Sequence, residues 1–252
     1  QMSKVLQGKV ALITGGSRGL GAVLAETLAD QGADIAITYA ASAAKAEAVV
    51  EKVRAKGVRA IAIQCDQADS SAAQPMVEQV VSEFGKLDIL INNAAIAVQG
   101  KLVDDPTLDG PAFDKQWIVN VLGTVAVTRA AAQKISDGGR IVFIGSGLGT
   151  RAIVPGVADY AGTKAAIAGY ARGVQRDLGP RNITVNVVQP GIMPTDMAAG
   201  AAENFPEAVL DLHPIRRIAT IEEVASAVSY LVGPTASYTA GAVIDVSGGV
   251  LV

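Results

Sequence analysis

Two reactive residue types are almost missing from this chain of 252 residues, which has one cysteine, Cys65, and one histidine, His213. A single cysteine excludes a disulfide within the chain. One cysteine and one histidine also supply too few ligands for a zinc site built from these residue types, so we expect no metal. A Ser-His-Asp hydrolase would have to use His213. In an enzyme with this composition, proton transfer falls to tyrosine, lysine, aspartate or glutamate.

The chain also lacks long apolar runs and an excess of positive charge. No stretch approaches the roughly 18 uninterrupted apolar residues of a membrane span, so we expect no membrane association. The net charge of −3 gives no electrostatic reason to expect nucleic acid as a partner. No charged-then-apolar signal pattern opens the sequence, and a cytoplasmic protein is the default expectation.

What the chain does have is a globular composition. Half of its residues are hydrophobic, 18% are charged, and no low-complexity stretch occurs. The length suits one large α/β core or two small domains. Neither a linker nor an internal repeat divides the sequence.

Short apolar runs alternate with helix-forming stretches along the whole chain. We expect strands over residues 10–13, 35–39, 59–65, 89–91, 140–145, 184–188 and 242–246. We expect helices over residues 22–30, 42–57, 71–84, 113–135 and 222–231, and around Tyr160. This alternation with short turns predicts an α/β fold, in which a parallel sheet is covered by helices on both faces.

Two irregular segments that contain proline follow strands, at residues 99–111 and 194–214. Ligands of open parallel sheets bind beyond the carboxyl ends of the strands, so both segments are candidate walls of a site. Two ordinary surface loops are the alternative, which is weaker for the second segment.

Tyr160 and Lys164 are four residues apart and share one face of the predicted helix. A free phenol titrates near ~10 and exchanges protons poorly at neutral pH. A lysine ammonium one turn away favours the phenolate and lowers its pKa. Ser146 follows the apolar run 140–145, and a strand there would deliver its hydroxyl to the mouth of the sheet. Alone, a Tyr-x-x-x-Lys spacing is a weak motif.

Gly15, Gly19 and Gly21 lie directly between the first strand and the first helix. Glycines there permit a tight turn and let phosphates approach backbone N–H groups at a positive helix end. The spacing is neither Gly-x-Gly-x-x-Gly nor a Walker loop. Taken by itself, an ordinary strand–helix turn explains it equally well.

Together these features resemble the short-chain dehydrogenase/reductase family along nearly the whole length. The matching residues are Thr14, Gly15, Gly19, Gly21, Asp66, Asn92, Asn93, Ala94, Asn120, Ser146, Tyr160, Lys164, Pro190, Gly191 and Thr195. The resemblance implies one Rossmann-type domain over residues 1–252, with a seven-stranded parallel sheet. It also implies assembly as a homotetramer or homodimer.

Catalytic roles follow from the resemblance. Tyr160 is the acid/base, and Lys164 holds the nicotinamide ribose and lowers the pKa of the phenol. Ser146 hydrogen-bonds the substrate carbonyl. Asn120 supports a water chain to bulk solvent through a break in its helix.

The resemblance further implies a nicotinamide cofactor. Its binding residues would be Thr14, Gly15, Ser17, Arg18, Gly19, Leu20, Gly21, Tyr39, Ser42, Asp66, Asn92, Ala94, Tyr160, Lys164, Pro190, Gly191, Ile192 and Thr195. Members that prefer NAD place an acidic residue at the end of the second strand, whereas Tyr39 stands there in this chain. Arg18 can instead face a 2′-phosphate, with Ser17 and Ser42 as neutral donors, so we predict NADPH. Ala95 departs from the glycine that many members have, and its methyl would crowd the cofactor floor slightly.

The favoured function is therefore an NADPH-dependent reductase of a small-molecule ketone. A β-ketoacyl-acyl-carrier-protein reductase is one alternative, and a nucleotide or metabolite sensor on the same fold is another. Carrier-protein reductases usually present two arginines near the site. This chain keeps Arg181, but an aspartate, Asp137, lies at the place of the other. A repulsive charge there favours a small free ketone or a ketone on a compact carrier.

Five further residues invite structural interpretations. Cys65 is read as a small buried hydrophobe and His213 as structural, with a substrate contact from its loop as the alternative. Arg217 is expected in an ion pair or a helix cap, and Asp159 as a solvated residue at a helix start. Trp117 could be core, but the resemblance favours a subunit interface.

Overall fold

Seven parallel strands form one sheet in the order β3-β2-β1-β4-β5-β6-β7. The computed structural model describes residues 4–194 and 205–252. The strands are β1 (Val10–Ile13), β2 (Asp34–Tyr39), β3 (Ala60–Gln64), β4 (Leu87–Asn92), β5 (Ile135–Ile144), β6 (Thr184–Pro190) and β7 (Val243–Val246). All seven predicted strands are present, and the predicted α/β fold is confirmed.

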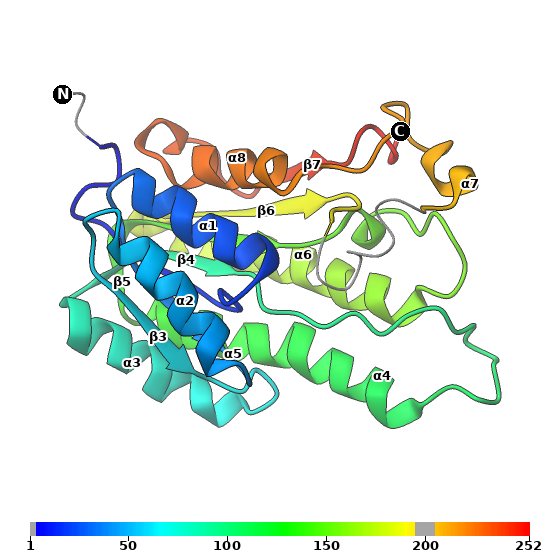
Figure 1. Cartoon of the computed structure of the whole chain (residues 1–252), viewed down its shortest axis with the longest axis horizontal. Helices are drawn as coiled ribbons and strands as arrows, with labels where there is room; N and C mark the ends of the chain where they lie inside the picture. Colours follow the sequence, from blue (N-terminus) through cyan, green and yellow to red (C-terminus); the bar gives the residue numbers. More distant parts are fainter. Residues whose placement is uncertain (1–3, 195–204) are drawn as a thin grey trace.

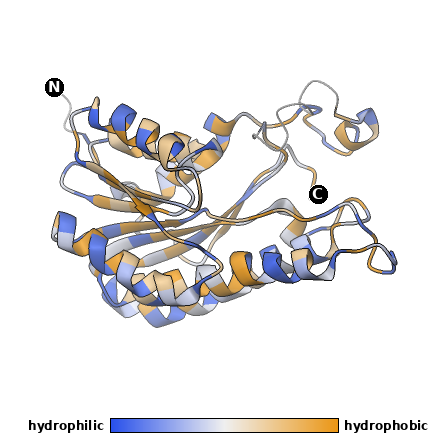
Figure 2. Cartoon of the chain, turned by 60° about the horizontal axis from the view of Figure 1, so that its bottom comes forward, coloured by the Kyte–Doolittle hydropathy of each residue, from blue (hydrophilic) through white to orange (hydrophobic). Residues whose placement is uncertain are grey.

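Helices cover both faces of the sheet, as Figures 1 and 2 show. One layer contains α1 (Gly19–Asp30), α2 (Ala43–Arg54) and α8 (Ile221–Val232), and the other contains α3 (Ala73–Phe84), α5 (Thr124–Ala132) and α6 (Ala158–Leu178). Each helix layer packs against one face of the sheet and forms its own apolar cluster there. Successive side chains of a strand join the two clusters alternately, because they point to opposite faces of the sheet. The central strands β1 and β4 are buried along their whole length, in agreement with the uninterrupted apolar sequence of β1.

Two shorter helices lie beside the carboxyl edge of the sheet: α4 (Gly110–Trp117), which contacts α6, and α7 (Glu207–Leu210). In Figure 1, β6 and β7 point toward the side where α7 and the C-terminus lie. Within residues 4–194 and 205–252, no helix is both long and apolar enough to cross a membrane.

The helix expected over residues 113–135 runs from Gly110 to Ala132 and contains a π-helical turn. The helix α4 ends at Trp117, a π-helical turn occupies Ile118–Gly123, and α5 ends at Ala132. Gly123 in that turn contacts Gln67 so closely that a Cβ would lie 2.1 Å from the Gln67 carbonyl oxygen. Ile135 is already the first residue of β5, where it pairs with Leu87. Residue periodicity does not reveal such a π-helical turn or the close approach of Gly123 to Gln67, which is distant in sequence.

The chain order reverses between β1 and β4, because β2 and β3 lie on one side of β1 and β4 to β7 on the other. Such a switch point opens a crevice at the carboxyl ends of the strands. Thr14, Asn93 and Gly191 are the first residues after β1, β4 and β6, and Ser146 is the second residue after β5. The fold therefore brings the segment from Thr14 to Gly21, here called the glycine loop, and the Ser146–Lys164 region to one edge of the sheet.

Candidate functional site

Lys164 lies in the second turn of α6 and reaches the end of β5. Its side chain is buried, at 5% exposure, and its Nζ donates a 3.0 Å hydrogen bond to the carbonyl oxygen of Ile144. Burial lowers the pKa of Lys164 from 10.5 to about 8. The Nζ is 5.8 Å from the centroid of the Tyr160 ring, so the helical spacing does bring the two side chains together.

The Ser146 hydroxyl, which accepts a 3.2 Å hydrogen bond from the Leu148 N–H, lies near enough to Tyr160 to influence its pKa. Burial raises the pKa of the phenol, and the Ser146 hydroxyl lowers it by less. We expected a pKa lowered by Lys164, so this differs in direction and in cause. The physical reason is that desolvation disfavours the phenolate, while the ammonium group is directed to the Ile144 carbonyl. Tyr160 is thus held as a neutral phenol, the form that donates a proton.

Asn120 lies in the π-helical turn between α4 and α5, so the helix break expected at this residue is present. Its side chain is 2% exposed, and its Oδ1 accepts a 2.8 Å hydrogen bond from the Ile96 N–H. Its Nδ2 donates to the Ile96 carbonyl at 2.8 Å and to the Thr163 hydroxyl at 3.2 Å. Asn120 therefore ties the segment after β4 to the helix that contains Tyr160.

The glycine loop is fixed by the strands on either side of it. The Thr14 hydroxyl accepts hydrogen bonds of 3.0 Å from the N–H groups of Asn93 and Ala94. The Gly15 N–H donates a 3.1 Å hydrogen bond to the Thr38 hydroxyl on β2. Side chains are excluded by close packing, since a Cβ on Gly21 would lie 2.2 Å from the Gly15 oxygen.

The loop fits a dinucleotide phosphate on two observations. Gly19 has φ +55°, and a Cβ built there would meet no atom within 4 Å, so the space beside its backbone is open. Arg18, the residue before α1, makes no capping hydrogen bond with its side chain. The N–H groups of the first turn of α1 therefore have no side-chain cap. Such N–H groups at a positive helix end bind phosphate. The Leu20 side chain belongs to the core, so that residue can offer only its backbone.

The residues expected near the adenosine end follow β2 and β3. Arg18 is exposed, and Tyr39 is half-buried at the end of β2. Ser42 caps α2 by accepting a 3.4 Å hydrogen bond from the Lys45 N–H. Asp66 is exposed and accepts a 2.9 Å hydrogen bond from the Ala68 N–H, beside the end of β2.

Asn92 is the last residue of β4, at the strand end where the cofactor is expected. Its side chain points away from the glycine loop, is 4% exposed and donates a 3.0 Å hydrogen bond to Thr128 on α5. Successive side chains of a strand face opposite sides, so the next residue, Asn93, faces the loop. The Asn93 Nδ2 donates 3.1 Å hydrogen bonds to the carbonyls of Thr14 and Gly15. Sequence reasoning missed this role of Asn93 and that of Thr38, although strand alternation was the signal for the first.

Beyond β6, Pro190 is buried and Gly191 approaches the segment after β7. A Cβ on Gly191 would lie 2.9 Å from the Ser247 Cα, and the Ile192 carbonyl accepts a 2.8 Å hydrogen bond from the Ala219 N–H. Thr195, expected at the cofactor, lies outside the described residues.

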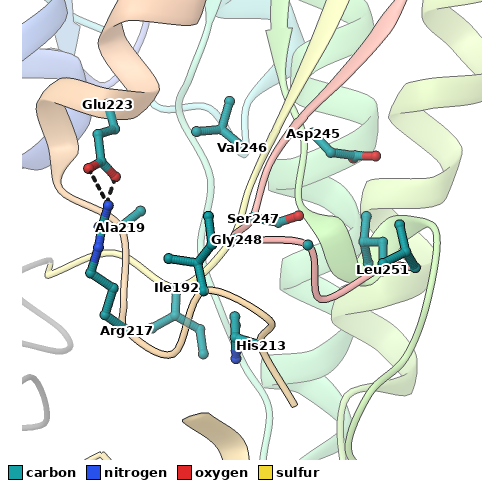
Figure 3. A pocket seen from close by; sticks show the side chains of 14 residues that line it. Ile192, His213, Arg217, Ala219, Glu223, Asp245, Val246, Ser247, Gly248 and Leu251 are labelled. Carbon is teal, nitrogen blue, oxygen red and sulfur yellow. Dashed lines mark hydrogen bonds and ion pairs between the residues drawn. The ribbon is translucent and has the colours of Figure 1, made fainter. Parts of the chain in front are cut away.

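A cavity of about 440 Å³ opens here, with Gly191, Ile192, His213 and Ser247 in its wall (Figure 3). Arg217 and Glu223 also line it, and they form an ion pair of 2.8 Å, as expected for Arg217. Among the described residues, Ser146, Tyr160 and Lys164 do not line this cavity. It borders the expected cofactor site at Gly191 and Ile192 but is not centred on the catalytic side chains.

The glycine loop also matches the spacing Gly-x-Ser-x-Gly at Gly15, Ser17 and Gly19, which hydrolases use for a nucleophilic serine. Such an enzyme would pair Ser17 with His213. Ser17 follows β1, whereas His213 lines the cavity beside β6 and β7, with β4 and β5 between. His213 is 5% exposed, and its Nδ1 is 2.9 Å from the Val209 carbonyl oxygen. The two side chains form no catalytic pair.

Known proteins match this arrangement over nearly the whole chain. A family model described as enoyl-(acyl carrier protein) reductase matches residues 15–251. A short-chain dehydrogenase from Burkholderia cenocepacia, solved in complex with NADP, is 46% identical with a TM-score of 0.92, over 98% of this chain and 100% of that one. The chain belongs to the short-chain dehydrogenase/reductase family.

Two curated relatives of this chain are reductases named for different substrates. Versicolorin reductase 1 of Aspergillus parasiticus is 38% identical, over 97% of both chains. The 3-oxoacyl-[acyl-carrier-protein] reductase of Staphylococcus aureus is 37% identical, over 96% of this chain and 97% of its own. This short-chain dehydrogenase/reductase is an oxidoreductase, and near-equal similarity to both relatives does not select its substrate.

Proposed function

We propose that this chain is an NADPH-dependent carbonyl reductase that converts a small-molecule ketone to an alcohol. The observation that supports it is the convergence of Ser146, Tyr160 and Lys164 at the carboxyl edge of the sheet. A half-buried, neutral Tyr160 can protonate the substrate oxygen, and Ser146 can donate a hydrogen bond to it. The bound nicotinamide would supply the hydride.

Lys164 would act both on Tyr160 and on the ribose of the bound cofactor. Its Nζ is held by the Ile144 carbonyl within 5.8 Å of the Tyr160 ring centroid, where it can also donate to a ribose hydroxyl. Asn120, fixed between Ile96 and Thr163, would support a proton path to solvent through the π-helical turn. We propose that these four residues are the catalytic set.

NADPH is the proposed cofactor because no acidic side chain follows β2. Tyr39 ends that strand, and Arg18 is exposed at the glycine loop, where a guanidinium can bind a 2′-phosphate. The relative from Burkholderia cenocepacia was solved with NADP, which supports the proposal.

A carrier-protein thioester is the second candidate, favoured by the 37% identity to the Staphylococcus aureus reductase. Arg181 argues against it. Its guanidinium forms a 2.8 Å ion pair with Asp137 and donates to the carbonyls of Ala132 and Ile135. Arg181 also follows the end of the 21-residue helix α6, about 30 Å from Tyr160, rather than near the site as expected.

The test is a panel of small ketones, diketones and β-ketoesters with NADPH, followed by loss of NADPH absorbance. We expect turnover of at least one small ketone. A chain that binds NADPH but reduces none of these substrates, nor a carrier thioester, would instead support the sensor hypothesis.

For the assembled protein we propose a homotetramer or homodimer, which the exposed Trp117, Ile118 and Leu122 of the α4 region would help to form.

A further inference from the structure

The first turn of α6, which contains Tyr160, begins without a side-chain cap. Val157 precedes the helix and has no group that could accept a hydrogen bond from the first N–H groups. Residues 150–157 before it form an irregular segment. Uncapped first turns fray unless other contacts hold them, so the position of Tyr160 depends on neighbouring elements.

Those contacts come from α4 and the π-helical turn after it. Trp117 and Asn120 are three residues apart there, and Asp159 and Thr163 are four apart on α6, so each pair shares a face. The Trp117 Nε1 donates a 2.8 Å hydrogen bond to Asp159, and the Asn120 Nδ2 donates to Thr163 at 3.2 Å. Asp159 is therefore a partner of Trp117 and not the freely solvated residue expected from the sequence.

The two hydrogen bonds enclose the turn that contains Tyr160. On the buried side, the Thr163 hydroxyl also donates a 2.8 Å hydrogen bond to the Tyr160 carbonyl. On the outer side, the indole of Trp117 lies against the backbone at Gly162, where a Cβ would be 2.8 Å from the ring. The indole thus contacts α6 both at Asp159 and at Gly162, the residues that bracket Tyr160 on this side.

We propose that Trp117 and Asp159 are positioning residues for catalysis: their hydrogen bond holds the first turn of α6 against α4 and sets the place of the Tyr160 hydroxyl. The proposal rests on the proposed function. A proton donor must lie within about 0.5 Å of its productive place, and small displacements reduce turnover more than binding. Loss of the Trp117–Asp159 hydrogen bond should therefore lower kcat and leave the KM for NADPH unchanged.

Four variants separate the hydrogen bond from ring packing and from charge. Trp117→Phe keeps an aromatic ring but removes the N–H donor. Asp159→Ala removes the acceptor, whereas Asp159→Asn keeps an acceptor oxygen without the charge. Tyr230→Phe is the matched control, because it removes another exposed side-chain hydrogen bond, 2.9 Å to Thr239, on α8.

We expect Trp117→Phe and Asp159→Ala each to lower kcat roughly five- to tenfold, as for the net loss of one ordinary hydrogen bond. The double variant should be no slower than the slower single variant, since both changes remove the same hydrogen bond. Asp159→Asn should recover most of kcat, and Tyr230→Phe should match the wild type. Asp159→Asn as slow as Asp159→Ala, or a wild-type kcat in Trp117→Phe, would overturn the proposal.

Two measurements need no turnover and so distinguish this proposal from the proposed function. Trp117 is the single tryptophan of the chain, so its fluorescence reports directly on the loss of Asp159. Amide hydrogen exchange over residues 158–164 should be faster in Trp117→Phe and Asp159→Ala and unchanged in Tyr230→Phe. If the wild type reduces no carbonyl, the proposed function fails and hydrogen exchange decides whether the pair orders the turn. Unchanged exchange in both variants would overturn the proposal whatever the activity.

Discussion

The Lys164 Nζ donates a 3.0 Å hydrogen bond to the Ile144 carbonyl, two residues before Ser146, so the end of β5 and the start of α6 are joined by a buried ammonium group. Burying a charge disfavours the protonated form and lowers the pKa of Lys164 to about 8. The hydrogen bond places the amine at the site, and folding is destabilised by the desolvation of its charge.

That cost gives the folding stability a definite pH dependence. The unfolded chain has a Lys164 pKa near 10.5 and binds more protons than the folded chain between about pH 8 and 10.5. The free energy of unfolding therefore increases as the pH rises through this window. Below about pH 8 the destabilisation by the buried Lys164 charge is present in full. Lys164→Met should raise the free energy of unfolding at pH 7 by about 1 to 3 kcal/mol, after allowance for the lost hydrogen bond.

The gain from Lys164→Met should shrink toward pH 10.5, as measured by urea unfolding at several pH values. Lys115→Met, at an exposed position on α4, is the control and should show no such trend. A Lys164→Met protein that is less stable than the wild type at pH 7 would contradict this account of the buried amine.

Gly19 and Gly57 form a matched pair for testing the phosphate site. Both have positive φ, +55° and +88°, and a Cβ on either would meet no atom within 4 Å. Substitution by alanine should thus strain the two backbones similarly, by about 1 kcal/mol. Gly57 follows α2, at the opposite edge of the sheet from the glycine loop.

We expect Gly19→Ala to weaken NADPH binding about tenfold or more, because its methyl would enter the space proposed for the phosphates. Gly57→Ala should leave the dissociation constant unchanged, as measured by NADPH fluorescence titration. Equal effects of the two substitutions on NADPH affinity would argue against a phosphate at Gly19.

Arg18 should decide between the two nicotinamide cofactors. Arg18→Ala should lower kcat/KM with NADPH by roughly tenfold or more and change the value with NADH little, because only NADPH has a 2′-phosphate. Arg172→Ala, at an exposed position on α6, is the control and should leave the ratio unchanged. Equal efficiency of the wild-type protein with both cofactors would refute the assignment.

The pairing of Arg181 with Asp137 leads to a prediction about substrate size. A paired arginine attracts an acidic carrier protein less than a free one does. We expect a higher kcat/KM for a small β-ketoester than for the corresponding carrier thioester. A preference for the carrier thioester that weakens as salt is raised would show that electrostatic capture operates despite the ion pair.

The sequence was informative wherever a property depends on residues close together in the chain. Apolar runs between turns located all seven strands, and the four-residue spacing brought Tyr160 and Lys164 to one face. Residue spacing did not predict the π-helical turn, in which Gly123 lies against Gln67, a residue distant in sequence. The raised pKa of Tyr160 likewise depends on burial by neighbouring elements, which a motif does not contain.

The site shows the same division between local and distant determinants. The glycine loop was recognisable from spacing, but which of two adjacent asparagines supports it required the direction of the side chains at the end of β4. Trp117 and Asp159 are 42 residues apart, and their hydrogen bond exists only because α4 packs against α6.

The central claim is that Tyr160 is the proton donor of an NADPH-dependent ketone reduction. The most direct test compares the wild type with Tyr160→Phe, measuring the NADPH dissociation constant by fluorescence and alcohol formation by mass spectrometry. We predict an NADPH affinity within about twofold of the wild type and at least a 100-fold loss of turnover, because the substitution removes the hydroxyl that transfers the proton. A Tyr160→Phe protein that forms alcohol at a near-normal rate would contradict the account.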